Sequence, residues 1–157
     1  MQTRSLVISA MFISALVLAL AVVAVAQNPN VGKWKMNPAR SKFSYPPPKS
    51  NTMTIEAQGN GIKAVQDMVD ADGKAIHRSW TAKYDGKDYH VTAPDQDAIF
   101  LTRPDTNTTE YVAKKSGKVV WSGRAVVSKD GKTSIDSGSG KDDKGQAFTY
   151  SFVMEKQ

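Results

Sequence analysis

Cysteine is absent from this sequence of 157 residues. The chain therefore has no disulfide bonds, no thiol nucleophile, no cysteine-ligated metal and no lipid-modified cysteine. Leucine is almost absent after residue 26, where Leu101 is the only one. Surface helices usually carry many leucines because leucine favours the helix and packs its apolar face. These two absences exclude thiol chemistry and argue against a helical fold.

The first 26 residues lack glycine, proline and every charge except Arg4. An almost unbroken apolar run over residues 6–23 is followed by Ala24-Val25-Ala26, a small-x-small pattern typical of signal peptidase sites. We therefore predict a signal peptide over 1–26, cleaved after Ala26, and one mature domain over 27–157. An uncleaved anchor is the alternative, because about 18 apolar residues can span a bilayer. With no disulfides, the export signal indicates a bacterial protein that is secreted or periplasmic.

Blocks of like charge are also absent, although the net charge is +6. Lysines and acids alternate at turns, as in Asp85-Gly86-Lys87-Asp88, whereas nucleic-acid-binding proteins gather their basic residues on one face. We expect a monomer with no nucleic-acid partner and, at most, loose association with an anionic envelope.

The mature part consists of short runs of β-branched and aromatic residues between glycine turns such as Asp72-Gly73 and Asp130-Gly131. Runs separated in this way predict antiparallel hairpins. The stretch from Gly138 to Gly145 also reads as a turn. The predicted strands are 31–36, 51–57, 61–70, 75–84, 88–92, 97–103, 108–115, 119–128, 132–137 and 146–154.

About eight to ten sequential strands in a single domain predict an all-β fold, an antiparallel up-and-down β-barrel whose closure removes exposed edges. One connection, Asn37 to Ser50, is long and contains Phe43 and three consecutive prolines, 46–48. Loops of this length often fold on themselves or cover a site. Phe43 is expected to close one barrel end as a plug, with a mobile lid as the alternative.

The motif Gly32-Lys33-Trp34, placed before this long loop, resembles the opening motif of lipocalins. The resemblance implies a calycin-type barrel in which Trp34 closes one end, although no arginine follows in the last strand to stack on Trp34. The wider pattern from Gly32 to Phe43 and the segments 84–89 and 127–133 are similar to those of short secreted bacterial lipocalin-like proteins. That group implies fold and export, and no catalytic or binding residues.

Residues for catalysis or metal binding are few. The two histidines, His77 and His90, lack the short spacings of a zinc site, and no Gly-x-Ser-x-Gly elbow is present. The aspartates beside glycines are typical of turns, where they bond their own backbone. Asp136 with Asp142 and Asp143 does not form a calcium loop. We therefore expect no enzyme activity, no metal and no cofactor.

Arg78 shares one strand face with Ile76, Trp80 and Tyr84, so alternation predicts that it points inward. A guanidinium there requires a partner, either a ligand carboxylate or an acid such as Asp67 or Glu110. The predicted function is binding of a small apolar or amphipathic ligand in the lumen. A filled barrel acting through its surface is the alternative. The expected ligand-binding residues are Arg78, Trp80, Tyr84, Trp121, Phe148, Tyr150 and Phe152, with Trp34 and Phe43 at the barrel ends.

Overall fold

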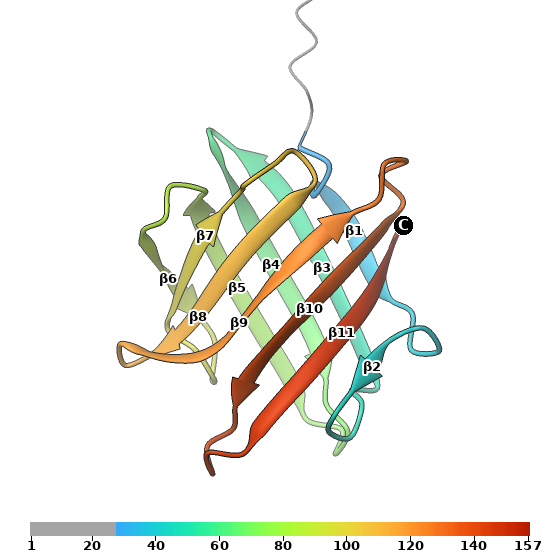
Figure 1. The fold of residues 1–157 in the computed structure, drawn as a ribbon, viewed down its shortest axis with the longest axis vertical. Coiled ribbons are helices and arrows are strands. Elements are labelled where there is room, and N and C mark those ends of the chain that lie inside the picture. Colours follow the sequence, from blue (N-terminus) through green and yellow to red (C-terminus); the bar gives the residue numbers. More distant parts are fainter. Residues whose placement is uncertain (1–27) are drawn as a thin grey trace, which may run out of the picture.

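The computed structural model describes residues 28–157, and all of its regular elements are strands (Figure 1). The predicted signal peptide lies outside the described residues. Within 28–157 there is no helix long and apolar enough to cross a membrane. The strands are β1 (Gly32–Met36), β2 (Lys42–Phe43), β3 (Ser50–Gln58), β4 (Gly61–Val69), β5 (Ala75–Lys83), β6 (Asp88–Thr92), β7 (Ala98–Thr102), β8 (Thr108–Lys115), β9 (Lys118–Val127), β10 (Thr133–Lys141) and β11 (Ala147–Lys156).

The strands form one closed antiparallel barrel. From β3 to β11 each strand pairs with the next along the chain, and β1 pairs with both β3 and β11. The short β2 also pairs with β11, beyond the point where β1 ends, so it continues the same track (Figure 1). This topology confirms the predicted all-β, up-and-down, lipocalin-like barrel.

The expected turn between 138 and 145 is wrong in its first half. Residues 138–140 lie inside β10, which is paired with both β9 and β11, and the turn begins only after Lys141. It is closed by a hydrogen bond from the Asp142 amide to the Gln146 carbonyl, 2.9 Å. Gly138 and Gly140 belong to the strand because aromatic side chains from neighbouring strands occupy the space beside them.

The interior contains two clusters of buried apolar side chains. One is built around Ile62, Val91 and Leu101, on strands β4, β6 and β7. The other joins the two ends of the chain, because Trp34 and Met36 of β1 pack with Phe152 and Met154 of β11. Barrel closure therefore rests on side-chain packing as well as on the ladder between β1 and β11.

Trp34 lies at the barrel end where the described chain begins. It is buried, and its Nε1 donates to the Asn30 carbonyl at 2.8 Å. Lys156 lies over the indole ring, where the resemblance to lipocalins led us to look for an arginine. Its Nζ is 4.8 Å from the ring centroid and donates to the Pro29 and Val31 carbonyls. This end is therefore sealed by the N-terminal segment, Trp34 and Lys156.

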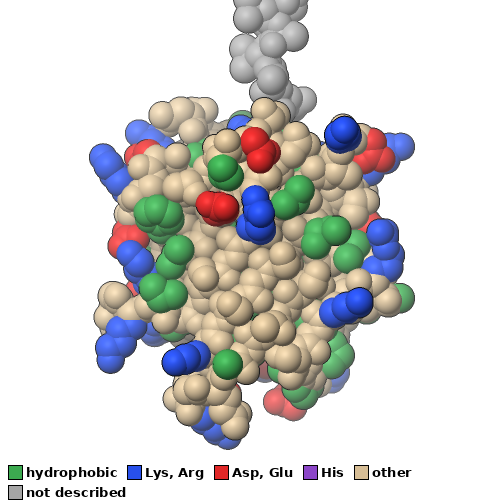
Figure 2. Space-filling view, in the orientation of Figure 1, with side chains coloured by type: hydrophobic (Ala, Val, Ile, Leu, Met, Phe, Trp, Pro, Cys, Tyr) green, Lys and Arg blue, Asp and Glu red, His purple; other side chains and the backbone are tan. Residues whose placement is uncertain are grey.

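The outer surface is polar and mixed in charge. On the face shown in Figure 2, lysine and arginine side chains are scattered around the outline, with acidic side chains among them. The large apolar side chains that are exposed among the described residues are Val119, Val126 and Ile135, all on β9 and β10.

Candidate functional site: a cavity inside the barrel

The barrel is not filled by its own side chains. A cavity of about 580 Å³ lies in its lumen. Its lining includes Tyr45 after β2, Asp70 between β4 and β5, and Asp142 and Gln146 between β10 and β11. These segments gather at the end opposite Trp34 (Figure 1), so the cavity opens there. Its volume falls within the range of about 300–1,000 Å³ typical of small-molecule sites.

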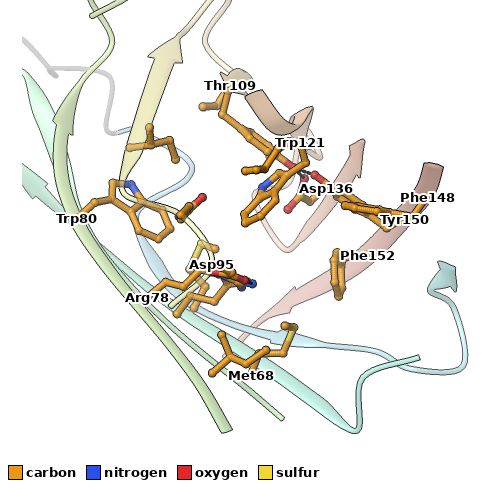
Figure 3. A pocket seen from close by; sticks show the side chains of 18 of the residues that line it. Met68, Arg78, Trp80, Asp95, Thr109, Trp121, Asp136, Phe148, Tyr150 and Phe152 are labelled. Carbon is orange, nitrogen blue, oxygen red and sulfur yellow. Dashed lines mark hydrogen bonds and ion pairs between the residues drawn. The ribbon is translucent and has the colours of Figure 1, made fainter. Parts of the chain in front are cut away.

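The predicted ligand-binding side chains are brought together in this cavity. All seven line it: Arg78, Trp80, Tyr84, Trp121, Phe148, Tyr150 and Phe152. Figure 3 labels each of them except Tyr84. The long loop contributes Tyr45, whose ring meets Phe148 edge-on at 5.7 Å. Phe43, expected at a barrel end, lies instead in the side wall, where it pairs with Tyr150 and packs edge-on against Phe152 at 4.9 Å.

Small residues on β9 and β10 make room for aromatic side chains of the cavity wall. Tyr111, Gly123, Gly138 and Tyr150 occupy one row across strands β8 to β11. The two tyrosines lean over the glycines and bring their hydroxyl oxygens to 2.5 Å. A Cβ at Gly123 would lie 2.6 Å from the Tyr111 hydroxyl, and one at Gly138 would collide with Tyr150. The glycines therefore allow the phenol rings to lie flat against the wall.

Arg78 is buried in the cavity wall, and its partner is Asp95. The guanidinium Nε donates to Asp95 Oδ1 at 3.0 Å, and Nη2 pairs with Asp95 Oδ2. Nη1 donates to Gln66 at 2.9 Å, and Trp121 stacks near the guanidinium. The expectation that an acid of the protein satisfies Arg78 is confirmed, because Asp95 makes a two-point contact.

The two acids predicted as partners of Arg78 were the wrong ones. Asp67 lies on the outer face and pairs with His77 at 2.7 Å, with both side chains mostly exposed. Glu110 also points outward, 3.9 Å from Arg124. Asp95 instead comes from the loop between β6 and β7, which strand alternation cannot place.

Asp136 is the second carboxylate of the lumen and lies on the opposite wall from Arg78 (Figure 3). Its Oδ1 accepts a hydrogen bond from the Tyr111 hydroxyl at 2.5 Å. Since each phenol has one proton, Tyr150 must donate in turn to Tyr111 when Asp136 is ionised. Burial raises the pKa of Asp136 to about 6, against the opposing effect of the hydrogen bond from Tyr111.

The same burial acts on the tyrosines around Asp136. It raises the pKa of Tyr45 to about 12, and it raises the pKa values of Tyr111 and Tyr150 further above the usual range, with the Asp136 charge adding to the effect. These phenols therefore stay neutral at physiological pH and serve as hydrogen-bond donors and ring surfaces. Asp136 itself is mostly ionised at pH 7.

The cavity combines aromatic walls with a few polar side chains. Its polar groups are spread over separate walls, and no cluster of three or more potential metal-ligating acids or histidines occurs within 28–157. Two buried polar atoms that line or adjoin the cavity, Trp80 Nε1 and Gln96 Oε1, have no hydrogen-bond partner among the described residues. The sequence analysis considered Asp136 only as a calcium ligand and did not place Asp136 or Tyr111 in the lumen. The inward orientation of Tyr111 could have been inferred, because it alternates with the outward Glu110.

Among the comparisons with known proteins, matches were found with solved structures only. No protein-family model matches the chain, and no curated protein matches it. Among solved structures, the barrel is similar to a zebrafish ileal bile acid-binding protein crystallised with cholic acid. The likeness covers 82% of this chain and 99% of that chain, with a TM-score of 0.48 and 8% sequence identity.

Proposed function

We propose that this protein binds a small amphipathic molecule inside the barrel, without transforming it. The observation that carries the proposal is the open cavity of about 580 Å³, with aromatic walls and a few buried polar groups. Apolar walls supply binding energy through the area they remove from water, while few polar groups set the orientation of the ligand. A barrel that acted only through its surface would have no need of this space.

The test uses N-phenyl-1-naphthylamine, an uncharged dye that becomes fluorescent in apolar surroundings. Two tryptophans, Trp80 and Trp121, line the cavity, whereas Trp34 lies beyond its closed end. Bound dye should therefore quench tryptophan emission by energy transfer, saturably and with one dye per chain. The matched variants are Trp121→Phe and Trp34→Phe. The decrease in tryptophan emission that the dye causes should become smaller in Trp121→Phe, and it should change less in Trp34→Phe.

Two outcomes decide the proposal. Saturable binding with the stronger signal loss in Trp121→Phe supports occupation of the lumen. Dye that does not bind, or binds without saturation, overturns it and favours the alternative of a protein that acts through its outer surface. Native mass spectrometry of protein purified from its own host provides an independent check, because a resident ligand adds its mass to the chain.

We also propose that the chain is exported to the periplasm or the medium after cleavage behind Ala26. Support comes from the apolar run over 6–23 and the Ala-x-Ala site at its end. The mature protein should then have the mass of residues 27–157. Recovery of membrane-bound protein that retains Met1 would contradict cleavage.

A further inference from the structure

Asp136 carries a charge in the lumen that nothing in the barrel neutralises. Oδ1 is bonded to Tyr111, while Oδ2 takes part in no hydrogen bond within the described residues. No arginine or lysine forms an ion pair with it in that part of the chain. The carboxylate lines the cavity, and Asp136 is half-buried. Buried carboxylates are normally paired, because an isolated charge in such a place is costly.

Arg78 does not balance this charge. The guanidinium donors bond Asp95 and Gln66, and none of them bonds Asp136. The cavity is lined by only two cationic side chains, Arg78 and Lys141, against five carboxylates, Asp70, Asp95, Asp136, Asp142 and Asp143. The lumen and its mouth are therefore acidic, although the whole chain has a net charge of +6.

The surroundings of Asp136 also suit a cation. Tyr111 and Tyr150 lie against it, and Phe148 stacks beside Tyr150 with ring centroids 6.2 Å apart. Aromatic faces attract cations, and the attraction is stronger when water is excluded. An anionic headgroup in the same place would face the Asp136 carboxylate, because Arg78 is engaged by Asp95 and the exposed Lys141 lies at the end of β10.

We propose, resting on the lumen-binding function above, that the ligand is a cationic amphiphile: a protonated amine on an alkyl or aromatic body. Its ammonium group binds Oδ2 of Asp136 among the tyrosine rings, and its apolar body extends along Trp121 and Phe152. The site therefore discriminates against fatty acids and other carboxylate-bearing amphiphiles. Arg78 is a structural member of the wall in this arrangement and not the anchor of a ligand.

The test is displacement of N-phenyl-1-naphthylamine at pH 7.5 by three molecules with the same chain: decylamine, 1-decanol and decanoate. Decylamine should displace the dye at a concentration at least about tenfold lower than decanol, as expected for a charge-assisted hydrogen bond. Decanoate should be the weakest. In Asp136→Asn the advantage of the amine over the alcohol should disappear, while decanol binding is unchanged. The matched control is Asp72→Asn, an exposed turn acid outside the cavity lining, which should keep the advantage. Asp143→Asn is made in parallel to test whether the acids at the mouth supply the selectivity.

Each result is decisive. Decanoate binding as tightly as decylamine overturns the inference and leaves the lumen-binding function intact. An amine advantage that survives Asp136→Asn but is lost in Asp143→Asn also overturns it, because the mouth then supplies the selectivity. Failure of the dye and of all three competitors overturns the lumen-binding function itself. If Asp136→Asn does not fold, the order of the three competitors on the unaltered protein decides the question alone.

Discussion

Replacement of Asp136 by asparagine should stabilise the folded protein at neutral pH. Asparagine keeps an oxygen that can accept the hydrogen bond from Tyr111, and it removes the charge. The folded-state pKa of Asp136 is raised from 3.8 to about 6. At 1.36 kcal/mol per unit, this difference of about two units corresponds to at most about 3 kcal/mol. Cavity water that reaches the carboxylate reduces the effect.

The sign of the pH dependence follows from this shift. Between pH 4 and 6 the folded protein binds more protons at Asp136 than the unfolded chain does, so its contribution to stability falls as pH rises. Above pH 6 the full cost is present. The free energy of unfolding of Asp136→Asn should therefore exceed that of the unaltered protein by up to about 3 kcal/mol at pH 7.5 and nearly match it at pH 4.

The assay is urea unfolding followed by tryptophan fluorescence at pH 4, 5, 6 and 7.5, with Asp143→Asn as the control. The difference between variant and unaltered protein is the quantity to compare at each pH. Turn aspartates such as Asp85 and Asp130, whose pKa values are lowered by hydrogen bonds from Tyr89 and Ser128, contribute equally to both proteins and cancel. A difference that does not change with pH, or a variant less stable at pH 7.5, would refute the reasoning.

Two further predictions concern the walls of the cavity. Gly138→Ala should lower the free energy of unfolding by about 1–3 kcal/mol, because the added Cβ meets Tyr150 and the Ser122 carbonyl. The control Ser139→Ala, at an outward-facing position, should change it by less than about 0.5 kcal/mol. Equal urea midpoints for the two variants would show that the glycine is not required. Asp95→Asn should lower the free energy of unfolding by about 2 kcal/mol, because Arg78 is left buried without a counter-charge. Asp67→Asn, which removes an acid from an exposed pair, should lower it by less than about 1 kcal/mol. Similar losses in both variants would contradict the importance of burial.

Much of the barrel is predictable because the strands alternate clearly. Phe148, Tyr150 and Phe152 share one face of β11 in sequence and line the cavity in space. The inward orientation of Arg78 follows from its neighbours Ile76 and Trp80 in the same way. Period-two alternation determines which side of a sheet a residue occupies, and in a closed barrel one side is the lumen.

The interior of β10 is where this reasoning fails. Alternation by hydrophobicity would place Ile135 inside and Asp136 outside, but Ile135 is exposed and Asp136 lines the cavity. Ile135 instead pairs across the outer surface with Val126. The inward positions of β10 hold small or polar residues because tyrosines from β8 and β11 already fill the space above them. Such a requirement comes from strands adjacent in space, and one strand's sequence does not contain it.

The inner face of β10 carries small residues together with the unpaired carboxylate of Asp136. Glycines at 138 and 140 make room for the rings of Tyr150 and Phe148 against the wall, and Asp136 on the same inner face lines the cavity. If the carboxylate served only the fold, replacing it by asparagine would make the protein less stable. If the carboxylate is placed to bind a cation, the replacement makes the protein more stable and removes its preference for a cationic ligand. Because the two properties of Asp136→Asn then change in opposite directions, stability and amine preference measured on that one variant distinguish a structural aspartate from a binding one.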